Sequence, residues 1–355
     1  MFLPILQPDS ESHEVDIVQQ DIDTRLRIIQ ELTAISGIGV GMAGKLVDAG
    51  CRSVEDLEQP TFNKMLSATM RVSLYFKDHL DKRATRDDAE SVLERIKETL
   101  SDEFEAILVG SYRRGAESSG DIDIILLHPS YVNVPVPTVT PSKSRSFNNG
   151  GPGRPKRLAI ARAGRNAQST RNETPLLGRA VWPLQDAGII AGTLVAGPFK
   201  WQGICRVPER IENGLWESKY GRLEAIKDRR GEFRRLDLRM IPVRSKGAAL
   251  LSLTGDLEFI KDLRIQACKL GMHLNEYGLW RWVSHDTEDT SDSSQEENGH
   301  WELIHTETEE DILHELDKSW IEPTKRNFSF LSDKARKKPE SRSRLIGSLD
   351  EKTSL

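Results

Sequence analysis

The feature that most restricts the fold of this chain is a pair of aspartates, Asp121 and Asp123, which begin an otherwise apolar run that ends at Leu127. Side chains two residues apart on a β-strand point to the same face, and the apolar residues around them are typical of a buried strand. Two carboxylates held this close together are stable only with a bound proton or metal ion. The spacing therefore predicts a strand whose end binds a hard cation.

The residues ahead of this strand are of the types that bind phosphate. A turn at Gly110 and Ser111, followed by Arg114, offers a backbone amide, a hydroxyl and a guanidinium. Oxygen ligands with room for water favour Mg²⁺ over zinc, and a metal beside a phosphate-binding turn predicts phosphoryl or nucleotidyl transfer. The alternative is that Asp-x-Asp is a solvated strand edge, but the preceding Gly-Ser turn favours the functional interpretation.

A third carboxylate is expected from a neighbouring strand. In the segment 233–242, Asp237 alternates with apolar residues and shares a face with Arg235 and Arg239. An aspartate between two arginines is usually a surface ion pair, which contributes little to stability. Its combination with Asp121 and Asp123 instead favours a shared metal site.

These motifs resemble the family X DNA polymerases, the group of DNA polymerases beta, lambda, mu and terminal transferase. The resemblance runs from about Ile28 to Phe328 with interruptions, and Gly110–Asp123 is similar to the family's most diagnostic motif almost throughout. It implies two Mg²⁺ ions on Asp121 and Asp123, for which Mn²⁺ can substitute. Asp237 would bind the catalytic ion and help to deprotonate the primer 3′-hydroxyl.

The resemblance also implies residues that bind the nucleotide and the DNA. The expected deoxynucleoside triphosphate ligands are Arg83, Ser111, Arg114, Gly120 and Gly255, and the expected DNA contacts are Gly37, Gly39, Lys45, Arg235 and Arg264. One position departs from the family, because Ile260 stands where a polar side chain usually contacts the incoming base. An apolar side chain cannot form that hydrogen bond, so we expect weaker nucleotide affinity than in a typical member.

Two short helical segments flank the turn Gly37-Ile38-Gly39. Such a turn lets another backbone approach closely and leaves amides and carbonyls free for a phosphate or a monovalent cation, although it can also be only a tight turn. It resembles a helix-hairpin-helix, which grips the DNA backbone regardless of sequence. In the family the carbonyls matching Thr33, Ile35 and Ile38 bind K⁺ or Na⁺.

We therefore expect an α+β protein with a helix-hairpin-helix subdomain, a nucleotidyltransferase palm on a mixed β-sheet, and a small α/β thumb. The expected divisions are a disordered start at 1–25, the hairpin subdomain at 26–84, the palm at 85–244 with a disordered basic insertion at 131–176, the nucleotide-selecting thumb at 245–330, and a basic disordered tail at 331–355. Residues 1–44 contain no lysine, so the lyase domain of several family members is not expected, and the sequence leaves no room for a BRCT domain; either the lineage lost them or the chain is truncated.

Charge is unevenly distributed along the chain. The net charge is −5, yet the stretch 131–175 carries eight basic residues against one acidic residue. DNA affinity depends on such local fields rather than on net charge. The stretch also contains Gly153-Arg154-Pro155, which is either a plain basic linker or the core of a minor-groove hook, and translated intron sequence is a further alternative.

The sequence favours template-directed gap filling by two-metal nucleotidyl transfer, in base-excision or end-joining repair. The connection Val195–Pro198 is short, whereas family members that add nucleotides without a template carry a longer loop there. The alternatives are a gap- or end-binding repair protein with weak catalysis, and a nucleotidyltransferase with a non-DNA substrate. Expected partners are gapped or primer-template DNA, deoxynucleoside triphosphates, and a repair ligase or end-joining factors.

Nothing in the composition indicates a membrane or a secreted protein. The chain has no run of about eighteen apolar residues, and its three cysteines lie far apart with no CxxC pair. We expect reduced thiols, no membrane partner and an intracellular protein. The basic cluster 334–338 favours the nucleus.

Overall fold

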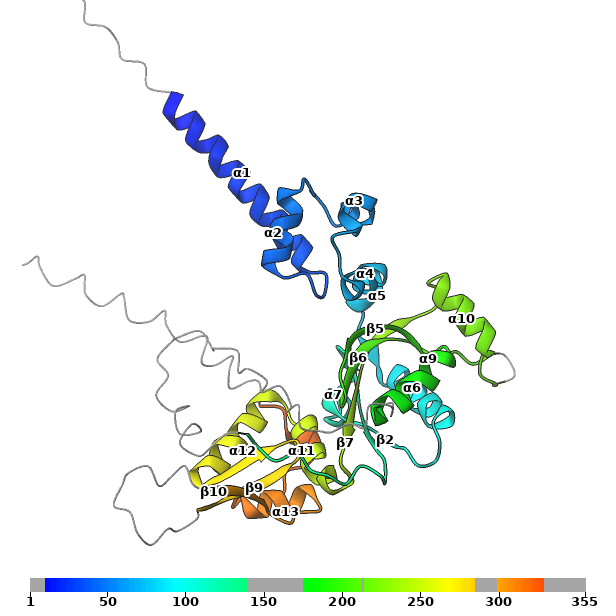
Figure 1. The fold of residues 1–355 in the computed structure, drawn as a ribbon, viewed down its shortest axis with the longest axis vertical. Helices are drawn as coiled ribbons and strands as arrows, with labels where there is room; N and C mark the ends of the chain where they lie inside the picture. Colours follow the sequence, from blue (N-terminus) through cyan, green and yellow to red (C-terminus); the bar gives the residue numbers. More distant parts are fainter. Residues whose placement is uncertain (1–9, 139–174, 212–213, 285–298, 329–355) are drawn as a thin grey trace, which may run out of the picture.

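The computed structural model of this chain describes residues 10–138, 175–211, 214–284 and 299–328. The described residues form an N-terminal helical part, a palm on a five-stranded sheet, and a thumb on a three-stranded sheet (Figure 1). This confirms the expected α+β class. The bulk of the basic insertion with its Gly153–Pro155 motif, and the tail with its cluster 334–338, lie outside the described residues.

The N-terminal part consists of short helices around one apolar core. Its elements are α1 (Ser10–Thr33), α2 (Val40–Asp48), η1 (Glu55–Glu58), α3 (Pro60–Asn63), α4 (Ala68–Tyr75) and α5 (Lys77–Leu80). Ile28 and Leu32 on α1 pack against Leu46 on α2. Helix α1 begins at Ser10, within the segment 1–25 that we expected to be disordered.

The palm follows with a strand pair, a sheet and the helices beside it. Its elements are β1 (Ala84–Thr85), α6 (Arg86–Thr99), β2 (Glu105–Leu108), α7 (Gly110–Arg113), β3 (Ser118–Ser119), β4 (Ile122–Leu127), α9 (Leu176–Asp186), β5 (Ile190–Ala196), β6 (Lys200–Arg206), α10 (Lys219–Lys227), β7 (Phe233–Ile241) and η3 (Val243–Ser245). The strand order is β2-β4-β7-β6-β5, with β4 and β7 parallel and the other neighbours antiparallel. The sheet is therefore mixed, as predicted.

The two faces of this sheet have different roles because its strands alternate. Ile122, Ile124 and their β7 neighbours Leu236 and Leu238 face the core that the sheet shares with α6 and α9. The opposite face carries the intervening residues, with Ile125 packed towards the thumb. Asp123 and Asp237 belong to this second face.

The thumb combines helices with an antiparallel sheet. Its elements are α11 (Lys246–Thr254), α12 (Leu257–Lys269), β8 (Met272–Asn275), β9 (Gly278–Ser284), β10 (Gly299–Leu303), α13 (Glu309–Glu315) and η5 (Pro323–Lys325). Thr308 caps α13 by accepting a hydrogen bond from the amide of Asp311. Ile260, expected beside the incoming base, is only 6% exposed and packs with Phe259 and Leu263 in the thumb core.

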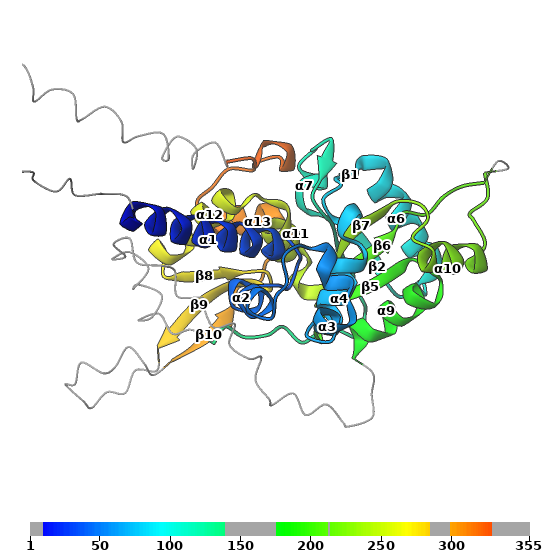
Figure 2. The ribbon, with the colours of Figure 1, turned by 90° about the horizontal axis from the view of Figure 1, so that it is seen from above.

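The palm joins the other two parts. Figure 1 shows the N-terminal helices and the thumb on the same side of the palm, one above and one below, and Figure 2 shows from above that the palm lies to their side. On the N-terminal side, the hydroxyl of Thr69 donates to the carbonyl of Leu194 (3.1 Å) and that of Tyr75 to the carbonyl of Lys227 (2.7 Å). These contacts fix α4 against the edge of the palm sheet.

Candidate active site

Three carboxylates meet at one end of the palm sheet. Asp123 and Asp237 are directly paired on the parallel strands β4 and β7, and Asp121 lies in the turn just before β4. One oxygen from each lies within 4.8 Å of the others. The structure therefore brings together all three aspartates that the sequence singled out, at a separation that one or two divalent ions can bridge.

Burial and mutual repulsion dominate the electrostatics of this triad. Burial, reinforced by the charges of Asp121 and Asp237, raises the pKa of Asp123 from 3.8 to about 7. Burial also raises the pKa of Asp237, against the effect of a hydrogen bond from Gln202. An all-oxygen site that is unfavourable when fully ionised fits a hard divalent cation such as Mg²⁺ or Mn²⁺, because the cation compensates the charge. The residues present therefore fit the metal that the sequence predicted.

We expect the affinity of the triad for Mg²⁺ to depend on pH near neutrality. Asp123 must lose its proton to bind a metal, so the affinity should fall about tenfold between pH 8 and pH 6. Isothermal titration of Mg²⁺ at these pH values measures it, and Asp123→Asn should remove the dependence. An affinity that stays constant across this range would contradict the coupling.

The same shift sets the pH dependence of stability in the metal-free protein. The pKa of Asp123 is about 7 in the folded state and 3.8 in the reference state, so the folded protein holds more protons between these values. Its free energy of unfolding therefore decreases as the pH rises through this window, by at most about 4 kcal/mol. A bound metal ion removes this decrease in the free energy of unfolding, because it compensates the charge of the ionised carboxylate in place of the proton.

Gly110 is required for the close approach of α7 to the triad. Its φ is +63°, and a Cβ at this position would overlap the carboxylate of Asp123. Only glycine adopts this conformation without cost and leaves space for the carboxylate. The Gly-Ser turn of the sequence motif is thus a steric condition for the position of Asp123.

Gly110→Ala should therefore displace Asp123. A displacement of about 1 Å is expected to lower the rate of nucleotide addition about 100-fold. Single-turnover extension measures the rate, and thermal unfolding reports the fold. Gly271→Ala is the matched control, because Gly271 also has a positive φ (+72°) but its Cβ would meet nothing within 4 Å. Equal losses in both variants would show that backbone strain, and not the collision, is responsible.

The predicted triphosphate ligands gather around the turn before β4. The hydroxyl of Ser111 donates to Ser119 (2.7 Å), and the guanidinium of Arg83 donates to the side chain and carbonyl of Ser118 (2.8 and 2.7 Å). Gly120 directly follows Ser119 in the sequence, and a Cβ on Gly120 would meet nothing within 4 Å. Arg83, Ser111 and Gly120 therefore lie around one turn that leads into Asp121.

Arg114 reaches from the palm to the thumb. Its guanidinium donates to the carbonyl of Thr254 (2.7 Å) and to the side chain of Asn327 (2.9 Å). Burial lowers its pKa, and the charges of Asp256 and Asp123 oppose that shift. Gly255 comes directly after Thr254, where a Cβ would collide with Phe259. Arg114 and Gly255 are thus brought together at the contact of palm and thumb.

The residues predicted to bind a monovalent cation, and some of those predicted to contact DNA, lie in the N-terminal subdomain. Thr33, Ile35 and Ile38 lie at the turn between α1 and α2, where the carbonyl of Ile35 accepts a hydrogen bond from the amide of Ile38 (3.0 Å). Gly37 has a φ of +95° and Gly39 caps α2.

The remaining predicted DNA contacts are exposed basic side chains. Lys45 lies in the last turn of α2 and Arg264 on α12, and both are exposed. Arg235 on β7 lies 3.9 Å from a carboxylate oxygen of Asp121. Arg235 is therefore the one of these three that the structure places beside the triad.

Sequence reasoning missed two polar neighbours of Asp237 on β6. Gln202 pairs directly with Asp237 across the strands, and its amide donates to Oδ2 of that carboxylate. The ammonium of Lys200 lies 3.9 Å from the same oxygen. The alternation of Lys200 and Gln202 with apolar residues marks a strand face, but the strand that this face adjoins cannot be read from the sequence.

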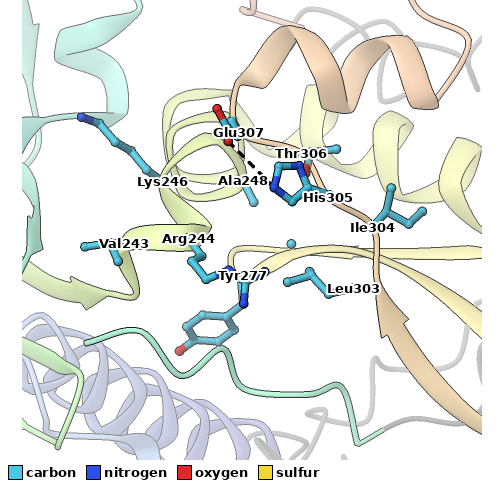
Figure 3. A pocket seen from close by; sticks show the side chains of 11 residues that line it. Val243, Arg244, Lys246, Ala248, Tyr277, Leu303, Ile304, His305, Thr306 and Glu307 are labelled. Carbon is cyan, nitrogen blue, oxygen red and sulfur yellow. Dashed lines mark ion pairs between the residues drawn. The ribbon is translucent and has the colours of Figure 1, made fainter. Parts of the chain in front are cut away.

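A separate cavity of about 390 Å³ lies where palm and thumb meet (Figure 3). It is lined by Val243, Arg244, Lys246, Ala248, Tyr277, Gly278, Leu303, Ile304, His305, Thr306 and Glu307. Lys246 reaches to Glu105 (2.6 Å), and His305 lies 3.8 Å from Glu307. No residue of the triad lines the cavity, so it is distinct from the candidate active site.

Two models of protein families match the sequence of this chain. The palm model of DNA polymerase beta matches residues 83–145 and the thumb model of DNA polymerase beta matches residues 249–327. The palm match contains Asp121 and Asp123, whereas Asp237 lies between the two matched segments. Among the described residues, no helix is long and apolar enough to cross a lipid bilayer.

Curated relatives agree with the two family models. DNA polymerase lambda of Rattus norvegicus is 23% identical over 316 residues, which covers 86% of this chain and 43% of the relative. DNA nucleotidylexotransferase of Xenopus laevis is 23% identical over 310 residues, covering 86% of this chain and 53% of the relative.

A shorter match is closer in sequence. DNA polymerase lambda of Arabidopsis thaliana is 30% identical over 112 residues, covering 31% of this chain and 21% of the relative. The chain thus spans about half, or less, of the curated relatives that it matches. The matches to a palm and a thumb of the DNA polymerase beta type, together with these relatives, support a family X DNA polymerase.

Proposed function

We propose that this protein is a Mg²⁺-dependent, template-directed DNA polymerase that fills short gaps during DNA repair. The observation that carries the proposal is the convergence of Asp121, Asp123 and Asp237 within 4.8 Å, beside a turn with phosphate-binding groups. The similarity to family X DNA polymerases supports the polymerase activity. The proposed setting is base-excision or end-joining repair in the nucleus, with a ligase or end-joining factors as partners.

In this mechanism the aspartates hold two Mg²⁺ ions, or Mn²⁺ in their place. Asp121 and Asp123 would ligate both ions and Asp237 the catalytic one. When bound, the ions supply Lewis acidity that activates the primer hydroxyl and neutralises the charge of the pyrophosphate leaving group. The triad is carried on two strands and an adjoining turn, so the ligands keep their spacing before substrate arrives.

The triphosphate would be held by the groups around the turn before β4. Ser111 and Gly120 would donate a hydroxyl and a backbone amide, and Arg83 and Arg114 would supply positive charge. Both arginines already donate to protein oxygens, namely those of Ser118, Thr254 and Asn327. An arriving triphosphate would therefore exchange these contacts for its own oxygens, and Gly255 would let the backbone approach its sugar.

DNA would lie between the N-terminal helices and the thumb, on the side of the palm where both are found. Gly37, Gly39 and Lys45 would contact the backbone of one strand, with K⁺ or Na⁺ on the carbonyls of Thr33, Ile35 and Ile38. Arg235 and Arg264 would contact DNA near the site. These contacts address phosphates and groove edges, so they would bind without sequence preference.

Templated addition is favoured by the tight connection between β5 and β6. The connection consists of Gly197, Pro198 and Phe199, and the amide of Gly197 donates to the carbonyl of Lys200 (2.8 Å). A turn this short is too small to take the place of a template strand. We therefore propose templated synthesis, although one curated relative is a nucleotidylexotransferase.

Primer extension on DNA with a one-nucleotide gap tests the proposal. The wild type should add the complementary nucleotide, whereas Asp237→Asn should bind the gap with unchanged affinity and extend it at least about 1000-fold more slowly. Extension of a single-stranded primer without a template should be negligible. Addition that does not depend on the template would contradict the proposal.

The second candidate is a gap- or end-binding repair protein with weak catalysis. It is favoured by Ile260, whose burial in the thumb core leaves no polar group at that position for the incoming base. In the same experiment, equal and poor extension by the wild type and Asp237→Asn, with equal binding of the gap, would select this candidate.

A further inference from the structure

Asp237, the triad residue that lies farthest from the other two in the sequence, has a hydrogen-bond partner that the proposed mechanism does not use. Gln202 lies directly opposite Asp237 on the antiparallel strands β6 and β7, and its Nε2 donates a hydrogen bond to Oδ2 of Asp237. An ionised carboxylate only accepts hydrogen bonds, so the amide must present its NH₂ group and not its oxygen. The pairing therefore has one orientation when Asp237 is charged.

Oδ2 of Asp237 also lies close to a positive group. The ammonium of Lys200, two residues along β6 on the same face, lies 3.9 Å from this oxygen. Asp237 is only 6% exposed, so water has little access with which to replace these partners. Both contacts from β6 thus go to Oδ2 of the carboxylate, and neither goes to Oδ1.

The strand that carries Gln202 is itself held in place. Trp201, the residue before it, is 2% exposed on the opposite face, and its indole donates to the hydroxyl of Thr193 (3.2 Å). The backbone of β6 is therefore fixed between β5 and β7, and the side chain of Gln202 starts from a fixed point.

We infer that Gln202 is a positioning residue that fixes the rotation of the Asp237 carboxylate and commits it to ligation through a single oxygen. The inference rests on the proposed function, because it assigns Asp237 to the metal site. Without the amide, the carboxylate can rotate or present both oxygens, and the distance to the attacking hydroxyl is no longer fixed. Gln202 does not touch substrate in this role, since it acts through Asp237.

Two substitutions separate this role from packing. Gln202→Met retains the length of the side chain but donates no hydrogen bond, and Gln202→Glu retains the shape but places a negative charge against Asp237. The matched control is Gln59→Met, which removes an amide donor to the carboxylate of Asp56 (2.8 Å) in the N-terminal helical part. Thermal unfolding of all three variants reports whether the fold is retained.

The first readout is metal binding, which needs no catalysis. Free Mn²⁺ is measured by electron paramagnetic resonance during titration, and Asp237→Asn identifies the signal that depends on this carboxylate. Removal of a residue that orients a metal ligand typically costs about 10- to 100-fold in metal affinity or activity. We expect a loss of about tenfold in the Asp237-dependent affinity for Gln202→Met, a larger loss for Gln202→Glu, and none for Gln59→Met.

The second readout is the separation of kcat from KM on gapped DNA. Gln202→Met should lower kcat about 10- to 100-fold and leave the KM for the nucleotide within about twofold, because no nucleotide contact is lost. Wild-type Mn²⁺ affinity and kcat in Gln202→Met would overturn the inference, as would retention of activity by Gln202→Glu. If the wild type itself extends no primer, the proposed function fails, while the Mn²⁺ titration still decides the role of Gln202.

Discussion

Asp123→Asn is expected to abolish nucleotide addition and, at the same time, to raise the melting temperature of the metal-free protein. Loss of a ligand shared by both ions should remove about 4 kcal/mol of transition-state stabilisation, which is a loss of about 1000-fold in rate. The stability should move in the opposite direction, because above pH 7 the folded protein holds a buried carboxylate against two others. An amide of the same shape removes that repulsion.

The stabilisation should be about 2 kcal/mol at pH 8, or roughly 4–8 °C in melting temperature. Differential scanning fluorimetry in chelator-treated buffer measures it, and the gain should disappear when Mg²⁺ is added. Asp186→Asn serves as the control, because Asp186 forms an exposed ion pair with Lys219 (2.7 Å) far from the triad. A lower melting temperature for metal-free Asp123→Asn would contradict the repulsion inferred from the structure.

Glu309→Ala is expected to be the most destabilising single change at the contact of palm and thumb. Glu309 accepts hydrogen bonds from Arg113 (2.8 and 2.5 Å) and from Arg326 (2.6 Å). Glu309 is 6% exposed and Arg326 is fully buried, so removing the carboxylate leaves the buried guanidinium of Arg326 without its charge partner. Such a loss typically costs about 3–5 kcal/mol.

The titration of Glu309 supports a strong interaction. Burial alone would raise its pKa, but hydrogen bonds from Arg113 and Arg326 outweigh burial and lower the pKa below the usual value. This stabilisation is present above the ordinary pKa of a glutamate and is lost as the pH falls through the lowered one. Stability should therefore decline in acid in the wild type and decline less in Glu309→Ala.

Urea unfolding of the two proteins measures the difference in stability. Glu310→Ala, at the exposed neighbouring position, is the matched control and should change stability by less than about 0.5 kcal/mol. Similar effects of Glu309→Ala and Glu310→Ala would show that the buried network contributes little. Because Arg113 adjoins Arg114, Glu309→Ala should also raise the KM for the nucleotide.

The triad could be predicted from the sequence because its chemistry is local. Asp121 directly precedes β4 and Asp123 lies within it, so one short sequence segment carries both, and the alternation around Asp237 is a property of β7 alone. The positions of Arg83, Ser111 and Arg114 followed from a contiguous motif or from a family resemblance. The present partners of Arg114, which are Thr254 and Asn327, come from the thumb and could not have been predicted in this way.

The residues that were missed depend on contacts between distant segments. Gln202 became significant only through its register with Asp237, and Glu309 only through two arginines from different elements. The start of α1 was different, because a local signal existed. Val15, Val18 and Ile22 follow helical spacing within the segment expected to be disordered, but the polar residues between them hid the pattern.

The parallel pairing of β4 and β7 has a consequence for how this protein can vary. Adjacent parallel strands cannot be joined by a hairpin, so a long excursion of the chain separates Leu127, at the end of β4, from Phe233, at the start of β7. The long basic segment lies in this excursion, together with α9, β5, β6 and α10. Insertions and deletions in the loops of this excursion leave the register of Asp123 and Asp237 unchanged. The site therefore tolerates changes of chain length between its own ligands.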